Sequence, residues 1–233
     1  METIRARLIE TIDRAPGIRS FRFMPEKRVN FLPGQFLEVI FDLQNKDLNK
    51  YLSFSSSPFK EYIEFTKRLS SSLFSEKLKG LQVNDEVLLK AALGSCVFKE
   101  EYKKIAFLVG GIGITPVISI LDYIAEKGLK TDASLFYSNR TDEDIAFRKE
   151  LDLLQSQNNN IKVFYLVTEC QPRDKKCFFG RIDKDFLTSQ AQDYKERVFF
   201  IFGPPKMVEA MQGICLDIGC KKENIKTENF IGY

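Results

Sequence analysis

Apolar and polar residues follow two different rhythms along this chain. In the first hundred residues, short apolar runs alternate with turn signals such as Pro16-Gly17 and Pro33-Gly34. Short apolar runs bounded in this way are typical of antiparallel strands. The predicted strands cover residues 4–10, 18–23, 35–41, 52–55, 62–67 and 86–90, with a helix near 75–81. Short strands at this spacing predict a small Greek-key barrel.

Beyond about residue 99, short apolar runs alternate with longer segments of helical periodicity. Strands are predicted at 104–109, 133–137, 161–167 and 198–201, and helices at 116–127, 142–156, 183–188 and 205–214. This alternation is typical of a doubly wound parallel sheet, in which ligands bind beyond the carboxyl ends of the strands. We therefore expect two domains, residues 1–99 and 100–233, the first all-β and the second α/β.

A glycine turn follows the first strand predicted for the second domain. Its glycines are Gly110, Gly111 and Gly113. Thr115 is predicted to cap the next helix, with Pro116 at its first helical position. Thr141 and Asp144 are expected to form a capping box at the start of the helix predicted from residue 142. A strand, a glycine turn and a capped helix present backbone amides to a pyrophosphate, although the turn taken alone is also compatible with a plain tight turn.

Composition excludes several classes of function. The chain has 35 basic and 32 acidic residues, a balance that does not indicate a nucleic-acid partner. It contains no histidine, which excludes catalysis by Ser-His-Asp or Cys-His groups. Its five cysteines have irregular spacing, so neither a disulfide framework nor an iron–sulfur or other metal site is predicted. No signal peptide or apolar run of membrane-spanning length is visible, and we expect a cytoplasmic protein.

Residues 110–116, Gly-Gly-Ile-Gly-Ile-Thr-Pro, resemble the Gly-Gly-x-Gly-(Ile/Phe)-Thr-Pro loop of the ferredoxin–NAD(P) reductase superfamily. Similar motifs continue in the family's order over essentially the whole chain. The resemblance implies a flavin-binding barrel in residues 1–99 and a nicotinamide-binding domain in residues 100–233. It also implies that the cofactors are FAD and either NADH or NADPH.

The flavin half resembles the family with departures. Residues 50–58 resemble Arg-x-Tyr-Ser-x-x-Ser-x-Pro, with Lys50 in place of the arginine that holds flavin phosphate and Leu52 in place of a stacking tyrosine. The resemblance places the Ser53 hydroxyl at flavin N5, as a catalytic residue. Ser75 matches the serine at the helix start that cradles the flavin pyrophosphate; an ordinary N-cap serine is equally compatible. The residues assigned to flavin are Lys50, Tyr51, Leu52, Ser53, Phe54, Ser55, Phe65, Lys67, Ser72 and Ser75.

The nicotinamide half carries two further motifs. Residues 136–147 resemble Tyr-(Gly/Ser)-x-Arg-Thr-x-x-Asp-Ile-x-Phe, which places Arg140 either at a 2′-phosphate or on the surface. Glu169 would repel that phosphate, which favours NADH slightly. Residues 202–207 resemble Cys-Gly-Pro-Pro-x-Met, with Phe202 at the position of the catalytic cysteine. The residues assigned to the nucleotide are Gly110, Gly111, Gly113, Ile114, Thr115, Pro116, Ser138, Arg140, Thr168, Glu169, Gly203, Pro204, Met207 and Phe230.

The chain ends with a Glu-x-Phe-x-Gly-Tyr pattern that is similar to the tail of many relatives. In the family, an aromatic side chain of this tail covers the flavin and moves before nicotinamide stacks. Phe230 and Tyr233 are the candidates, and a frayed terminus is the alternative.

The resemblance implies an FAD-dependent NAD(P)H oxidoreductase. Such an enzyme passes hydride from nicotinamide to FAD N5 and then single electrons to ferredoxin, flavodoxin, an oxygenase component or a small-molecule acceptor. Two alternatives remain: a reductase that uses free flavin as its substrate, and an electron-transfer subunit of a larger complex. We expect a monomer or weak dimer, although no motif fixes the oligomeric state.

Overall fold

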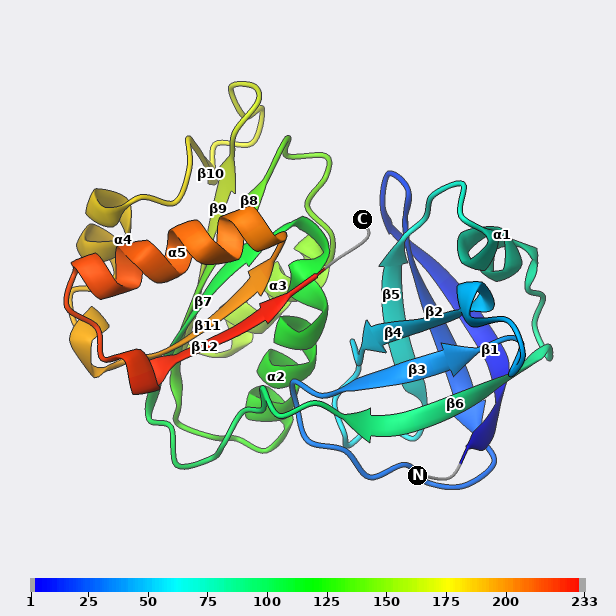
Figure 1. The fold of residues 1–233 in the computed structure, drawn as a ribbon. Coiled ribbons are helices and arrows are strands. Elements are labelled where there is room, and N and C mark those ends of the chain that lie inside the picture. Colours follow the sequence, from blue (N-terminus) through cyan, green and yellow to red (C-terminus); the bar gives the residue numbers. More distant parts are fainter. Residues whose placement is uncertain (1–2, 231–233) are drawn as a thin grey trace. The chain divides into compact units, whose positions relative to one another are not determined.

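The computed structural model describes residues 3–230, and the chain divides into two compact units (Figure 1). The first unit holds the chain up to Phe98 together with Thr115–Tyr123, and the second holds Lys99–Ile114 and the chain from Ile124 onward.

The first unit is built on a six-stranded antiparallel sheet in the order β4-β3-β6-β1-β2-β5. An isolated bridge between Phe54 and Phe65 links the chain just after β4 to β5, so the two outer strands of the sheet meet. This arrangement confirms the predicted antiparallel barrel. The elements are β1 (Ile4–Ala15), β2 (Ile18–Pro25), β3 (Phe36–Ile40), η1 (Lys46–Leu48), β4 (Asn49–Ser53), β5 (Ile63–Arg68), α1 (Leu73–Gly80) and β6 (Glu86–Leu93).

Aromatic side chains fill the interior of the barrel. Phe65 stacks on Phe21 and Phe23, with ring centroids 5.6 and 5.4 Å apart. Phe54 stacks on Phe31 at 3.8 Å. Successive residues of a strand face opposite sides of the sheet. Arg22 on β2, and Glu64 and Thr66 on β5, are neighbours of these phenylalanines and therefore lie on the outer face.

The second unit is built on a six-stranded parallel sheet in the order β10-β9-β8-β7-β11-β12. In Figure 1, α5 crosses in front of this sheet and α3 lies behind it. The strands are β7 (Lys104–Gly110), β8 (Asp132–Asn139), β9 (Ile161–Val167), β10 (Cys177–Phe179), β11 (Val198–Gly203) and β12 (Ile225–Asn229). The helices are η2 (Gly111–Gly113), α2 (Ile114–Glu126), α3 (Arg148–Gln157), α4 (Lys184–Gln190), η3 (Tyr194–Glu196), α5 (Pro205–Asp217) and η4 (Lys222–Asn224).

The predicted doubly wound sheet is confirmed, and its strand order locates the place where a ligand is expected. From β7 the chain proceeds to β8 on one side, whereas β11 pairs with β7 on the other side. The point between β7 and β11 is therefore the topological switch point, where ligands of open α/β sheets bind at the carboxyl ends of the strands.

Two predicted helix starts are wrong. The helix α2 begins at Ile114, directly after the single-turn η2, so Thr115 and Pro116 lie within its first turn instead of capping it. The helix α3 begins at Arg148, six residues later than predicted. Thr141 does donate to Asp144 at 3.0 Å, but this contact closes a loop that leads to Phe147, whose φ is 58°. Within residues 3–230, no helix has both the length and the apolar character needed to cross a membrane.

Candidate functional site

The three glycines after β7 lie at the switch point, and each meets a different constraint. A Cβ on Gly113 would overlap the backbone of β11, since it would meet the carbonyl oxygen of Phe202 and approach its carbonyl carbon to 2.7 Å. A Cβ on Gly110 would meet the sulfur of Met207 instead. Gly111 has open space around it but a φ of 51°, in the left-handed region that favours glycine. The absence of side chains at Gly110 and Gly113 thus allows the chain between β7 and α2 to approach the end of β11 closely.

The turn is fixed from below by a tyrosine. The hydroxyl of Tyr137, on the neighbouring strand β8, donates to the carbonyl oxygen of Gly111 at 3.0 Å. The amide of Ile114 donates to the carbonyls of Gly111 and Ile112, which closes the single turn. The amides at the start of α2 are therefore held at the carboxyl edge of the sheet, as a pyrophosphate site requires.

The end of β11 lies at the same switch point. Phe202, Gly203, Pro204 and Met207 lie beside Gly110 and Gly113, so the structure brings both predicted nucleotide motifs together. The Phe202 ring is fully buried, with its centroid 6.1 Å from Phe200 and 6.5 Å from Phe230. The Phe230 amide donates to the Gly203 carbonyl at 2.9 Å, which holds the chain after β12 against this turn. Tyr233, the other predicted aromatic lid, lies outside the described residues.

The ends of β8 and β9 carry the residues predicted at the adenosine. The amides of Thr168 and Glu169 donate to the carbonyls of Asn139 and Arg140 at 3.1 and 3.0 Å. The side chains of Arg140 and Glu169 form an ion pair at 3.4 Å and are 79% and 57% exposed. Glu169 thus pairs with the guanidinium that was predicted either at a 2′-phosphate or on the surface. The pair is exposed enough to contribute little to stability.

Asn139 ends β8 between Ser138 and Arg140, and the motif places all three side chains at the ribose of the adenosine, although only the two neighbours were assigned to the nucleotide. Its carboxamide is 6% exposed, and neither its nitrogen nor its oxygen has a hydrogen-bond partner in the structure. Leaving a buried amide unpaired costs about 1–3 kcal/mol, so such a group calls for a partner. Its place at the carboxyl end of β8 fits a polar ligand at this edge of the sheet. A polar side chain ending an otherwise apolar strand is the signal that would have assigned it to the nucleotide.

Glu228, on β12, is a residue to which the motif analysis gave no role. It lies opposite Phe202 in the parallel pair of β11 and β12. Burial raises the pKa of its carboxyl group to about 7. Burial therefore favours the protonated form of this carboxyl group.

The barrel carries a concentration of positive charge where flavin phosphate was predicted. Lys67 is only 5% exposed, and burial followed by the nearby charge of Lys50 lowers the pKa of its amine. An anion bound between these lysines would offset both effects. Lys50 and Lys67 therefore fit the phosphate of a flavin nucleotide, although lysine lacks the bidentate geometry of arginine.

Three serine hydroxyls gather at the start of α1. Ser70, Ser72 and Ser75 lie 3.1–3.2 Å from one another through their oxygens. Ser72 is the N-cap, since its side chain accepts from the Ser75 amide at 3.3 Å, whereas Ser75 is fully buried within the first turn. The capping role considered for Ser75 thus belongs to Ser72. The hydroxyls and free amides of this turn suit a pyrophosphate.

The apolar residues assigned to flavin are mostly buried in the barrel. Leu52, Phe54 and Phe65 have almost no exposed surface, and Ser53 is buried at the end of β4. Tyr51 is exposed, with its ring edge-on to Phe36 at 5.8 Å.

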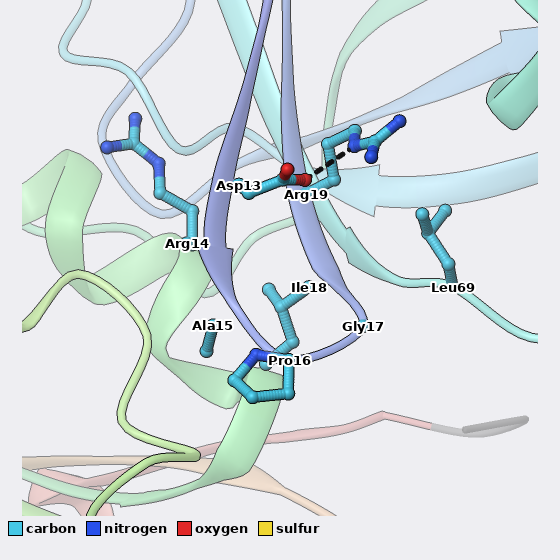
Figure 2. A pocket seen from close by; sticks show the side chains of 8 residues that line it. All are labelled: Asp13, Arg14, Ala15, Pro16, Gly17, Ile18, Arg19 and Leu69. Atoms are coloured by element: carbon cyan, nitrogen blue, oxygen red, sulfur yellow. Dashed lines mark hydrogen bonds and ion pairs between the residues drawn. The ribbon is translucent and has the colours of Figure 1, made fainter.

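A pocket of about 470 Å³ lies at the tip of the hairpin between β1 and β2, lined by residues 13–19 and Leu69. In Figure 2, the Asp13–Arg19 pair and the Arg14 side chain lie on opposite sides of the hairpin. None of the predicted site residues lines this pocket. The Leu69 amide donates to the Gly17 carbonyl at 2.7 Å, so the hairpin tip supports the loop that leads to the three serines.

Comparison with known proteins gives the same picture. Residues 107–213 match the family model described as an oxidoreductase NAD-binding domain. NADH-cytochrome b5 reductase 1 of Dictyostelium discoideum is 30% identical over 217 residues, which cover 90% of this chain and 76% of that protein. The glycine betaine monooxygenase reductase subunit of Chromohalobacter salexigens is 28% identical over 235 residues, which cover 96% of this chain. The chain spans 63% of the length of that subunit.

Solved structures agree on the fold. A ferredoxin NADP+ reductase from Neisseria gonorrhoeae, with bound FAD and NADP, superposes with a TM-score of 0.83. It is 20% identical, and the match covers 98% of this chain and 99% of that one.

Proposed function

Because this chain belongs to the ferredoxin–NAD(P) reductase superfamily, we propose that it is an FAD-dependent NAD(P)H oxidoreductase that delivers electrons to a protein acceptor. The observation that carries this proposal is the close approach of the glycine turn after β7 to the turn after Phe202, at the switch point between β7 and β11. The relatives include the reductase subunit of a monooxygenase and a cytochrome b5 reductase. An oxygenase component or a small electron-carrier protein such as ferredoxin or flavodoxin is therefore the proposed acceptor.

The residues divide the work between the two units. Lys50, Lys67 and the serines at the start of α1 would hold the flavin phosphates, and Ser53 would contact the flavin ring. The amides from Gly111 to Thr115 would hold the nucleotide pyrophosphate. FAD, when bound, supplies the conversion of a two-electron hydride donor into single-electron steps.

We propose NADH as the preferred donor, since Glu169 occupies the guanidinium of Arg140. Replacing Glu169 with glutamine should raise kcat/KM for NADPH about tenfold, because it removes a negative charge from the 2′-phosphate position and releases Arg140. The value for NADH should change less than twofold. Steady-state rates with both nucleotides and ferricyanide as the acceptor would measure this.

Glu143→Gln is the matched control. It breaks another exposed ion pair, with Arg173 at 2.9 Å, by the same change of charge. Equal gains of NADPH activity in the two variants would contradict a specific role of Glu169.

The visible absorption spectrum of the desalted protein, before and after anaerobic addition of NADH, tests the proposed function. A flavin spectrum that NADH bleaches is the expected result. A colourless protein that reduces added flavin with NADH would support the free-flavin reductase instead. A bound flavin that is bleached by neither NADH nor NADPH would overturn the proposal. Bleaching without turnover of ferricyanide would favour a subunit of a larger complex.

A further inference from the structure

A buried polar network lies on the outer face of β2 and β5, and the motif analysis gave its central residue no role. Its central residue is Glu64, which is 2% exposed. Ser20, Thr66 and Ser55 around it are equally buried. A carboxylate is rarely buried unless it is paired, because losing its hydration costs several kcal/mol.

Two arginines and a serine satisfy the Glu64 carboxylate. Arg14 donates to its Oε2 at 3.0 Å and Arg22 donates to the same oxygen at 2.7 Å. The hydroxyl of Ser55 donates to Oε1 at 2.9 Å. Arg22 reaches outward to Glu10, at 2.7 Å, and Glu10 is 52% exposed at the rim of the network.

The hydroxyls extend the network between strands. Thr66 Oγ1 lies 2.8 Å from Ser55 Oγ and 2.6 Å from Ser20 Oγ. Arg14 donates from Nε to Ser20 Oγ at 2.7 Å. Each hydroxyl therefore has two polar neighbours, as a network buried away from water requires.

Residue 64 also holds the chain after β4 through its backbone. The Ser55 amide donates to the Glu64 carbonyl at 2.8 Å, and the Glu64 amide donates to Ser56 Oγ at 3.0 Å. The amide, the carbonyl and the carboxylate of this one residue thus all contact Ser55 or Ser56. Ser55 and Ser56 follow Ser53 by two and three residues. Fixing their positions therefore leaves little freedom for the backbone that carries the Ser53 hydroxyl.

We propose that Glu64 is a positioning residue for flavin: it fixes the segment 53–56 in the conformation that presents Ser53 to the flavin ring. The inference rests on the proposed function. Glu64 does not touch the reacting atoms and acts through Ser55 and Ser56. The network ties together β2, β5 and the end of β4, the last two of which carry the residues assigned to flavin.

Glu64→Gln tests the role of the carboxylate in the full-length chain. Glutamine preserves the size of the side chain but removes the negative charge that Arg14 and Arg22 share. We expect the dissociation constant for FAD, measured by fluorescence titration of the flavin-free protein, to rise at least tenfold. Glu10→Gln is the control, since it removes the same charge from the exposed rim, and it should change the constant less than twofold.

A double variant, Arg14→Met with Glu64→Leu, separates positioning from stability. Replacing a buried ion pair by apolar residues of similar size is often neutral for stability. We expect Glu64→Gln to lower the midpoint of thermal unfolding and the double variant to restore it. The FAD dissociation constant of the double variant should nevertheless stay at least tenfold above that of the unmodified protein. It also decides the question if Glu64→Gln does not fold.

An FAD dissociation constant within twofold of the unmodified protein, in Glu64→Gln or in the double variant, would overturn the inference while leaving the proposed function intact. Failure of the unmodified protein to bind FAD would overturn the proposed function, and this inference with it.

Discussion

Gly113→Ala is expected to destabilise the second unit by about 2–3 kcal/mol and to raise the KM for NADH at least tenfold. The added Cβ would meet the carbonyl oxygen of Phe202 and lie 2.7 Å from its carbonyl carbon and 3.1 Å from the Gly203 amide nitrogen. These are backbone atoms of β11, which pairs with β7 and β12 and so has no freedom to withdraw. The start of α2 must move away instead, and with it the amides proposed to hold the pyrophosphate. Urea unfolding and steady-state kinetics with NADH would measure the two effects.

Two other glycines provide matched controls for this substitution. Gly110→Ala meets the sulfur near the end of the flexible Met207 side chain, so the neighbour yields and the effect should be smaller. Gly213 lies within α5 with nothing near its Cβ position, so alanine there should stabilise the helix by about 0.5–1 kcal/mol. If Gly113→Ala proved as mild as Gly213→Ala, close contact between η2 and β11 would not be the reason for glycine at position 113.

The fold was accessible from the sequence because its signals are local and repeated. The strands β7 and β9 were predicted within one residue, since each is a mainly apolar run bounded by polar residues or glycine. The strands β10 and β12 were missed. β12 reads Ile-Lys-Thr-Glu-Asn, and its one buried residue gives no periodic pattern. It is a strand because β11 offers it a free edge, which is a property of the assembled sheet.

Helix starts were harder to predict because capping chemistry is not specific to helices. Thr141 and Asp144 form their hydrogen bond in a loop. The helix begins only at Arg148, after Phe147 has adopted a left-handed conformation. At α2, Thr115 does not cap the helix, because the helix follows the glycine turn directly and begins two residues earlier than predicted.

The site shows the same division between local and long-range information. The motifs identified which segments meet, and the switch point does bring Gly113 and Phe202 together. They did not reveal that Glu169 pairs with Arg140, that Asn139 lacks a partner, or that Glu64 anchors the segment after β4. Each of these depends on residues that lie far apart in sequence or on burial, and neither can be read from one motif.

The raised pKa of Glu228 leads to the second large effect, a loss of stability as the pH rises. Burial holds the pKa of its carboxyl group at about 7 in the folded chain, against an ordinary value of 4.5. Between these values the folded chain keeps a proton that the unfolded chain has released, so the free energy of unfolding falls as pH rises through this window. Above about pH 7 the destabilisation is complete and should reach about 2 kcal/mol, allowing for partial exposure.

Glu228→Gln removes this pH-dependent destabilisation, because glutamine does not ionise. The variant should therefore match the unmodified protein at pH 4.5 and be more stable than it at pH 8, as measured by urea midpoints. Glu223→Gln, at an exposed position in η4, should show no such divergence. A constant difference between the unmodified protein and Glu228→Gln at both pH values would mean that packing of the side chain, and not its ionisation, determines the effect.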